Sequence, residues 1–317
     1  MKNSLRLLAA GLLALAPFAA SAKIERTVEK SFAVQPGGTL TVSTQGGRIS
    51  VEPSADGTLK VIAREKIRAS SEAEADEILK KLDLAIEQHG NDVSATAKYE
   101  SRPMGFQWGS WPPVQVEFIV TAPAGFSVDV KTSGGDITVG DRSGRIQART
   151  SGGNIRLGKV TGEVEAHTSG GDVRLAECTG SAKLSTSGGN ITAGRVGGTA
   201  ELSTSGGDIK VESVAGQLRA ATSGGNVTAK ITGPLQGNCV LSTSGGDVKA
   251  TVDASAGFVL DASTSGGSVD ATGLTVTIEK GGAGRSRLAG KVNGGGPTLK
   301  LRSSGGGITV RAGSGAE

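Results

Sequence analysis

The sequence predicts an all-β protein, a two-sided parallel β-solenoid of the β-helix or β-roll kind. Glycine recurs every nine residues from 135 to 225, aliphatic residues follow each glycine at a spacing of two, and Thr-Ser-Gly-Gly recurs every eighteen residues from 132. A spacing of two places both aliphatic side chains on one face of a strand, and glycine suits a tight corner. Two nonapeptides therefore make one 18-residue coil, and coils stack as parallel strands. Parallel crossovers favour a right-handed coil.

The first residues, 1–22, have the pattern of a secretory signal peptide. Lys2 and Arg6 give a basic start, and an apolar run follows from Leu7 to Leu15. This run is too short to cross a bilayer, so we expect no membrane span after cleavage. The mature chain is predicted to begin at Lys23 and to be exported, remaining periplasmic or being secreted or held at the cell surface.

Residues 23–131 form a β-rich region that departs from the nine-residue repeat. Within it, residues 37–53 carry a degenerate copy of the coil, with Thr44-Gln45-Gly46-Gly47 followed by Ile49 and Val51. The spacing of two is the same as in the regular copies, which predicts a coil at the outer end of the solenoid.

A short helix and a hairpin are predicted next. Residues 71–81 begin with Ser71, a good N-cap, and acidic residues crowd the first turn. Residues 82–99 alternate between apolar and polar on both sides of His-Gly-Asn-Asp, which predicts a β-hairpin. Because a solenoid end exposes strand edges that invite aggregation, we expect the helix and hairpin to cap the N-terminal end.

An aromatic loop is predicted at residues 101–115, which hold both tryptophans of the chain. Its large apolar residues are Met104, Phe106, Trp108 and Trp111. Two interpretations stay open: these side chains plug the end of the solenoid, or they form a patch that contacts a protein or glycan partner. They are the candidate partner-binding residues of the sequence.

The regular solenoid is predicted over residues 132–271, where the residue after Ser-Gly-Gly alternates between Asp and Asn. Equivalent positions in neighbouring coils lie about 5 Å apart, where two carboxylates repel by roughly 1–3 kcal/mol. Asn between two Asp residues doubles that separation, which suggests a stacking role. An outer column uses opposite charges in the same way, and its members are Glu165, Lys183, Glu201 and Arg219.

The C-terminal part, residues 272–317, is predicted to hold irregular coils and a cap. It carries a last copy of the motif, Ser303-Ser304-Gly305-Gly306 followed by Ile308 and Val310. This copy follows a break in the period, which is typical of a terminal repeat.

The two cysteines are predicted to be free. Cys178 falls at a corner, whereas Cys239 takes an inward position three coils away, about 14 Å at roughly 4.8 Å per coil. A disulfide needs α-carbons within about 7 Å of each other, so two buried thiols are expected even in an oxidising compartment.

The chain resembles a bacterial family of exported β-strand-repeat proteins, the domain-of-unknown-function 4097 family, whose members are often called candidate adhesins. The similarity rests on the opening "SFAVQPGGTLTVSTQGGRISV", the repeated "TSGGDI" and "TSGGNI", and the closing "LAGKVNGGGPTLKLRSSGGGITV". It implies the solenoid fold and an adhesin-like role. It implies no catalytic residues and no cofactor.

Charge and composition narrow the function classes. Without Lys2 and Arg6 the chain has 32 basic and 30 acidic residues, so nucleic acid is not an expected partner. The leading hypothesis is a non-catalytic interaction or structural protein of the cell envelope, a monomer with an unknown protein or glycan partner. Regularity favours it, because a catalytic site would interrupt the coils.

Two other functions stay as alternatives. A calcium-binding β-roll needs Gly-Gly-x-Gly-x-Asp, whereas here the acid directly follows Gly-Gly and alternates with Asn. A polysaccharide-cleaving β-helix enzyme needs clustered acids or a basic residue on one face. A basic stripe is present, but His89 and His167 have no recognisable partners and no nucleophile triad is apparent. The stripe consists of Arg156, Arg174, Lys210 and Lys249, in one column with Thr138, Thr192 and Thr228.

Overall fold

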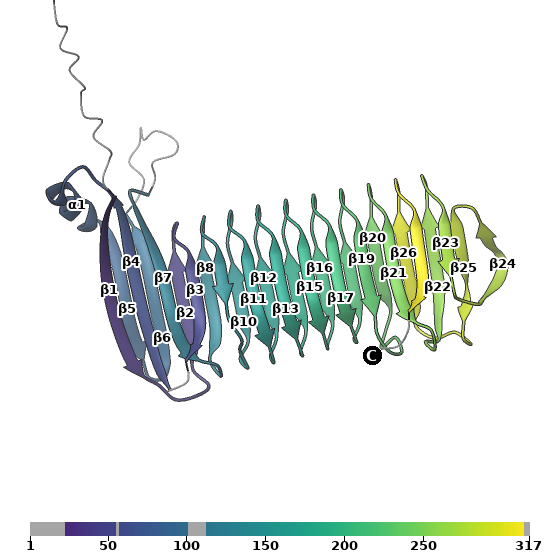
Figure 1. Cartoon of the computed structure of the whole chain (residues 1–317), viewed down its shortest axis with the longest axis horizontal. Helices are drawn as coiled ribbons and strands as arrows, with labels where there is room; N and C mark the ends of the chain where they lie inside the picture. Colours follow the sequence, from purple (N-terminus) through teal and green to yellow (C-terminus); the bar gives the residue numbers. More distant parts are fainter. Residues whose placement is uncertain (1–22, 55–56, 101–111, 314–317) are drawn as a thin grey trace, which may run out of the picture.

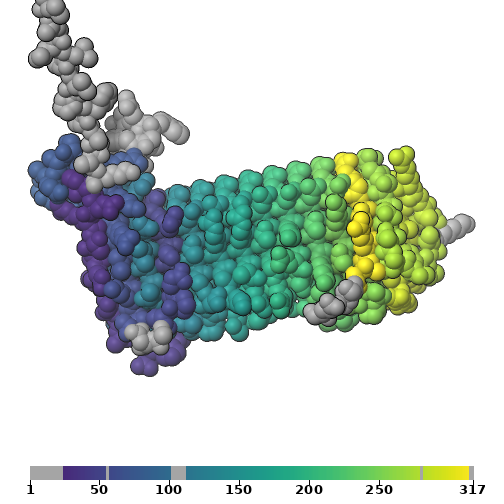
Figure 2. Space-filling view, in the orientation of Figure 1, coloured from purple at the N-terminus to yellow at the C-terminus, as the bar shows by residue number. Residues whose placement is uncertain are grey.

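The computed structural model describes residues 23–54, 57–100 and 112–313, and it confirms the two-sided parallel β-solenoid (Figure 1). The described residues form one sheet of 13 strands, one sheet of 14 strands and one helix. The two sheets face each other along an elongated body, and the surface seen in Figure 2 is smooth and continuous. The predicted signal, residues 1–22, lies outside the described residues.

In both sheets the spatial order of the strands, followed from the N-terminal end, differs from their order in the chain. The 13-stranded sheet consists of β1 (Lys23–Ala33), β4 (Thr58–Arg68), β7 (Val114–Pro123), β3 (Ile49–Ser54), β9 (Ile137–Val139), β11 (Ile155–Val160), β13 (Val173–Cys178), β15 (Ile191–Val196), β17 (Ile209–Val214), β19 (Val227–Ile231), β21 (Val248–Asp253), β27 (Ile308–Gly313) and β23 (Val269–Thr272). The 14-stranded sheet consists of β5 (Leu82–His89), β6 (Asp92–Tyr99), β2 (Thr39–Thr44), β8 (Ser127–Thr132), β10 (Ile146–Arg149), β12 (Val164–His167), β14 (Ala182–Ser185), β16 (Ala200–Ser203), β18 (Leu218–Ala221), β20 (Cys239–Thr243), β26 (Thr298–Ser303), β22 (Phe258–Thr264), β25 (Arg287–Val292) and β24 (Val276–Gly284).

The core is a narrow layer of aliphatic side chains between the two sheets. In one coil Ile155, Leu157 and Val160 point inward from β11, and Val164 and Ala166 point inward from β12; none is more than 4% exposed. Each fully buried aliphatic side chain of this size contributes about 1.5–3 kcal/mol. The spacing of two in the sequence therefore builds this continuous core.

In the middle of the solenoid, coils stack in chain order. Ile155 pairs with Val173 in the 13-stranded sheet, and Val164 pairs with Ala182 in the 14-stranded sheet. Both pairs are eighteen residues apart, so the 18-residue coil is confirmed.

At the C-terminal end the stacking order differs from the chain order. The coil of β26 and β27 lies between the coil of β20 and β21 and the coil of β22 and β23. The prediction that the last motif copy is a terminal repeat was therefore wrong. After β21 the chain leaves the position of one coil open and forms β22 to β25 beyond it. It then returns, and β26 and β27 occupy the open position (Figure 1). The antiparallel pair β24–β25 extends the 14-stranded sheet at this end.

At the N-terminal end, too, the stacking order differs from the chain order. The coil of β2 and β3 comes first in the chain, but it lies between two coils that come later. β2 pairs in parallel with both β6 and β8, and β3 pairs in parallel with both β7 and β9. The sequence predicted that this degenerate coil lies at the outer end of the solenoid. The structure shows that it does not. Strands β6 and β7 form a further coil outside it, and the antiparallel strands β5, β4 and β1 lie beyond.

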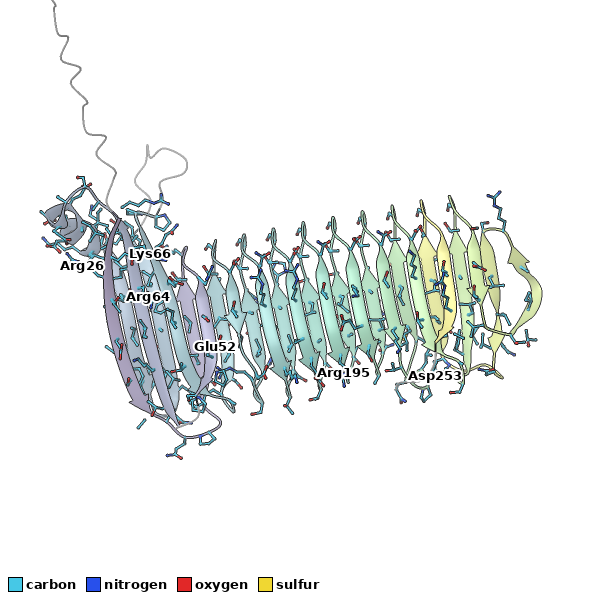
Figure 3. All side chains as sticks on the ribbon, in the orientation of Figure 1. Arg26, Glu52, Arg64, Lys66, Arg195 and Asp253 are labelled. Carbon is cyan, nitrogen blue, oxygen red and sulfur yellow. The ribbon has the colours of Figure 1, made fainter. Side chains whose placement is uncertain are left out.

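The helix α1 (Glu72–Leu79) lies at this end, between β4 and β5 in the chain. Ser71 caps it by accepting a hydrogen bond from the Glu74 N–H at 3.2 Å. Arg26 of the edge strand β1 forms ion pairs with Glu72 at 3.0 Å and Asp76 at 2.6 Å, and Figure 3 shows it beside the helix. These contacts tie the helix to the edge strand of the sheet.

A buried arginine fills the corner where the N-terminal coils leave the regular pattern. Arg142 takes the inward corner position that Val160 holds in the next coil, and it is 3% exposed. Its Nη1 donates to the carbonyl oxygens of Ala122 and Pro123 at 3.3 and 3.0 Å. Burial lowers the pKa of Arg142 to about 10, against a smaller opposing attraction by Glu52.

Candidate functional site

The Thr-Ser-Gly-Gly corners line one long edge of the solenoid. Thr150 Oγ1 donates to the Gly135 carbonyl in the preceding coil at 3.0 Å and accepts from the Gly153 N–H of its own turn at 3.3 Å. These threonines are buried, so their hydroxyls hold the corners together and are not presented to a ligand. The buried corner threonines are Thr44, Thr132, Thr150, Thr168, Thr186, Thr204, Thr222, Thr243 and Thr264.

The alternating Asp and Asn residues form a second ladder beside the corners. Asp136 Oδ1 accepts from the Asn154 backbone N–H at 2.8 Å and from Asn154 Nδ2 at 3.2 Å. Asn154 Oδ1 accepts in turn from the Asp172 N–H at 2.9 Å. A carboxylate and an amide offer the same acceptor oxygen, so either fits, and alternation separates the charges. The ladder continues through Asn190, Asp208, Asn226, Asp247 and Gly307.

The ladder also bears on the calcium alternative. Calcium needs several oxygen ligands converging on one point, whereas the Oδ1 atom of each of these side chains accepts from a backbone N–H of the next coil, and the Oδ2 atom of Asp172 accepts from Arg174. Within residues 23–54, 57–100 and 112–313, no group of three or more His, Cys, Asp and Glu side chains is placed to hold a metal ion.

The structure brings His167 together with a serine that the sequence analysis did not pair with it. His167 Nδ1 lies 2.8 Å from Ser185 Oγ, one coil further along the same outer column. A catalytic imidazole also needs an orienting group, and among the described residues no carboxylate bonds to its other ring nitrogen. Its neighbour on the preceding strand is Arg149. His89 is likewise not alone, since Glu87 lies 3.3 Å from its Nε2.

Both cysteines are free and buried, as predicted. The Cys178 thiol donates to the Gly162 carbonyl at 3.2 Å. Burial raises the pKa of Cys178 and of Cys239, which disfavours the thiolate form that a nucleophile or metal ligand requires.

The candidate partner-binding residues Met104, Phe106, Trp108 and Trp111 lie outside the described residues. The strands on either side of it in the chain are described: β6 ends at Tyr99 and β7 begins at Val114. The loop joins β6 of one sheet to β7 of the other, the same crossing that Thr-Ser-Gly-Gly makes between β8 and β9.

The outer face of the 14-stranded sheet balances its charges strand by strand. Glu165, Lys183, Glu201 and Arg219 occupy one column in that order, as predicted. Arg149 pairs with Glu165 at 2.7 Å, and Lys183 lies 3.8 Å from Glu201. A shallow groove of about 270 Å³ on this face is lined by residues of both signs, among them Arg145, Glu163, Glu165, Lys183 and Glu201.

The outer face of the 13-stranded sheet carries the basic stripe. Its first cations have acidic partners: Arg174 pairs with Asp172 at 2.8 Å, and Lys210 lies 3.6 Å from Glu212. The stripe does not end at Lys249, because the intercalated strand β27 adds Thr309 beside it. A second shallow groove of about 250 Å³ lies here, lined by Thr228, Lys249, Ala250, Thr251, Thr309 and Arg311.

Parallel coils, an aliphatic core and side-chain ladders along one edge define a repeat protein of the two-sided β-solenoid class. The family model described as Toastrack DUF4097 matches residues 47–311. The chain belongs to this family, as its resemblance implied. A search of curated proteins gives no match.

Several solved structures are similar over most of their length. A candidate cell adhesion protein from Clostridium sporogenes is 12% identical, with 91% of this chain and 100% of that chain covered and a TM-score of 0.26. A candidate adhesin from Bacteroides fragilis is 14% identical, with 90% and 97% covered and a TM-score of 0.37. A candidate lipid-binding protein from Parabacteroides distasonis is 14% identical, with the same coverage and a TM-score of 0.47.

Proposed function

We propose that this protein is an exported, non-catalytic interaction protein of the cell envelope with an adhesin-like role. The observation that carries the proposal is that the repeated polar side chains form hydrogen bonds within the solenoid. The threonine and Asp/Asn side chains, which would be the obvious ligands of a catalytic or metal site, are bonded from coil to coil. The outer faces of the two sheets and the aromatic loop are therefore the surfaces that we propose for contact with a partner.

The predicted signal sequence supports an envelope location, either periplasmic or at the cell surface. Among the described residues, no helix is long and apolar enough to cross a membrane. The aromatic loop, residues 101–115, holds both tryptophans of the chain, Trp108 and Trp111, as the side chains that would contact a partner. Aromatic anchors of this kind dominate many interfaces.

Protease treatment of intact cells, compared with a periplasmic extract, tests the location. We expect cleavage at the aromatic loop in one of these two fractions, and N-terminal sequencing of the mature protein to start at Lys23. A chain that keeps residues 1–22 and stays in the cytoplasm would overturn the proposal.

Attachment assays test the role itself. A strain that lacks the protein is compared with strains that carry the wild type or Trp108→Ala/Trp111→Ala, on surfaces coated with host or envelope glycans and proteins. We expect attachment or envelope integrity to fall without the protein and to return with the wild type. Normal behaviour of the deletion strain in both assays would contradict an interaction role.

A further inference from the structure

A group of six outward side chains lies near the C-terminal end of the 13-stranded sheet, on the neighbouring strands β19, β21 and β27. They form two rows across these strands, in which cations and hydroxyls alternate. We call them the cation–threonine patch: Thr228, Lys249 and Thr309 in the first row, and Lys230, Thr251 and Arg311 in the second.

The patch exists only because of the unusual stacking order. Thr309 and Arg311 belong to the coil that returns between two earlier coils, and they pair with Lys249 and Thr251. Neighbouring strands are about 4.8 Å apart. The three cations therefore follow one another strand by strand along the axis of the solenoid.

The cations of the patch differ from the rest of the basic stripe in their pairing. In the described part of the chain, no salt bridge involves Lys230, Lys249 or Arg311, whereas Arg174 and Lys210 each have an acidic partner. Unpaired cations at an exposed face give a local positive potential that attracts anions.

Acidic groups border the patch, but among the described residues none of them forms a salt bridge with its three cations. Glu212 on β17 is 3.6 Å from Lys210, and Asp270 on β23 accepts from Thr272 at 3.4 Å. Asp253, at the lower strand ends in Figure 3, accepts two hydrogen bonds from Ser255 at 2.9 and 2.7 Å. These bonds lower the pKa of Asp253, with a smaller contribution from Lys230.

The shape of the patch favours an extended polymer. Its groove is shallow, about 250 Å³, and the sheet around it is flat, so a small ligand would find few enclosing walls. Ala250, the apolar lining residue, is buried at 1% exposure. A surface without exposed apolar side chains has nothing to insert into a bilayer, which disfavours a lipid surface.

We propose that the cation–threonine patch binds an acidic polysaccharide that runs along the axis of the solenoid. This inference rests on the proposed interaction function and names its partner class. Carboxylate or sulfate groups of the polymer pair with Lys230, Lys249 and Arg311 on successive strands. The threonine hydroxyls between them donate to acidic oxygens or accept from sugar hydroxyls.

The test measures binding of the full-length mature protein to dextran sulfate, polygalacturonate, uncharged dextran, and vesicles with and without phosphatidylglycerol. We compare the wild type with Lys249→Gln/Arg311→Gln and with a control, Lys183→Gln/Arg219→Gln. The control removes the same charge from exposed positions of the opposite sheet. Circular dichroism and thermal melting check that each variant is folded.

We expect both acidic polymers to bind, with a loss of tenfold or more for Lys249→Gln/Arg311→Gln and less than twofold for the control. Binding weakens as salt rises, because exposed charge pairs are screened, and Lys249→Arg retains it. Equal losses in the two double variants show a net-charge effect and overturn the proposal.

Stronger binding to anionic vesicles than to either polymer overturns it in favour of a membrane surface. Failure to bind any acidic polymer also overturns it. The attachment assay of the deletion strain reads out the general interaction role separately, so the two failures are distinguishable.

Discussion

The middle of the solenoid and its two ends obey different rules of chain order. From β10 to β16, every strand pairs with the strands of the preceding and following coils, eighteen residues away. At the ends, the corner hydroxyls reach much further along the chain. Thr132 donates to Gly47, 85 residues away, and Ser303 donates to Gly246, 57 residues away.

This difference shows how a repeat protein closes its ends. A coil in the middle is held by segments that are near in sequence, so it forms with little loss of chain entropy. A coil filled in at an end is held on both sides by distant segments, so several parts of the chain must be in place together. Loss of such a coil therefore breaks strand pairing on both of its sides.

Removal of residues 297–317 is expected to have the largest effect. It deletes β26 and β27, whose four fully buried aliphatic side chains contribute about 1.5–3 kcal/mol each, and leaves the place between β20–β21 and β22–β23 empty. Hydrogen exchange is expected to show lost protection in residues 239–292 and retained protection in 146–221. The deleted core residues are Leu299, Leu301, Ile308 and Val310.

Removal of residues 314–317 alone serves as the control, because β27 ends at Gly313. Unchanged protection of residues 258–292 in the longer truncation would show that the end does not depend on the returning coil.

Gly171→Ala tests how closely the backbones of neighbouring coils approach in the middle of the solenoid. A Cβ at Gly171 would collide with the carbonyl of Gly153 in the preceding coil, whereas a Cβ at Gly134 meets nothing within 4 Å. We expect Gly171→Ala to cost about 3 kcal/mol or more of unfolding free energy. Gly134→Ala is the matched control and is expected to change it by less than about 1 kcal/mol. Chemical denaturation of both compares them, and similar midpoints would contradict the close approach.

The sequence predicted the middle well because its signals are local. The spacing of two gave the strands, and glycine gave the corners; the ladder of Asp136 and Asn154 followed from their equal places in successive coils. The order of the ends could not be predicted. The motif at Ser303 identifies a corner but carries no information on which coil lies beside it.

The same limit applies to the candidate sites. The basic stripe was visible as far as Lys249, but only the returning coil places Thr309 beside it in the same column and Arg311 in the neighbouring row. The His167–Ser185 contact was missed although both residues hold the same position in successive repeats, which was a usable signal. The role of Trp108 and Trp111 stays a prediction.

Asn190→Asp tests whether the ladder separates charges. The variant puts three carboxylates in adjacent coils, with Asp172 and Asp208 on either side, while its oxygen can still accept from the Asp208 N–H, a bond of 2.8 Å in the wild type. We expect a loss of about 1–3 kcal/mol at neutral pH. The loss shrinks as pH falls below about 4, where carboxylates become protonated. Urea unfolding at neutral pH and at a pH below about 4 measures this loss of unfolding free energy. Asn190→Ser, which adds no charge, is the control. A loss independent of pH would argue against repulsion.

Glu65→Gln tests how the stability of the N-terminal end depends on pH. Glu65 is 5% exposed on the inner side of β4, and burial raises its pKa against a smaller attraction by Arg26. A raised pKa in the folded state means that Glu65 favours folding at low pH and loses that contribution as pH rises through its folded-state pKa. We expect Glu65→Gln to raise the melting temperature at pH 7 and to leave it nearly unchanged at pH 3. Glu117→Gln, whose partner is Lys66 at 2.9 Å, is the control and is not expected to stabilise.

Calcium is expected to have the smallest effect, because the ladder oxygens already accept backbone N–H groups. At about 5 mM calcium, above the dissociation constants of roughly 10⁻⁴–10⁻³ M typical of extracellular modules, the melting temperature is expected to equal that in EDTA. A true site occupied at 100 times its dissociation constant would add about 2.7 kcal/mol. Magnesium at the same concentration controls for screening. A rise with calcium alone would mean that Asp172 and its equivalents release their N–H partners to bind metal, and that the middle of the solenoid is a calcium-binding β-roll.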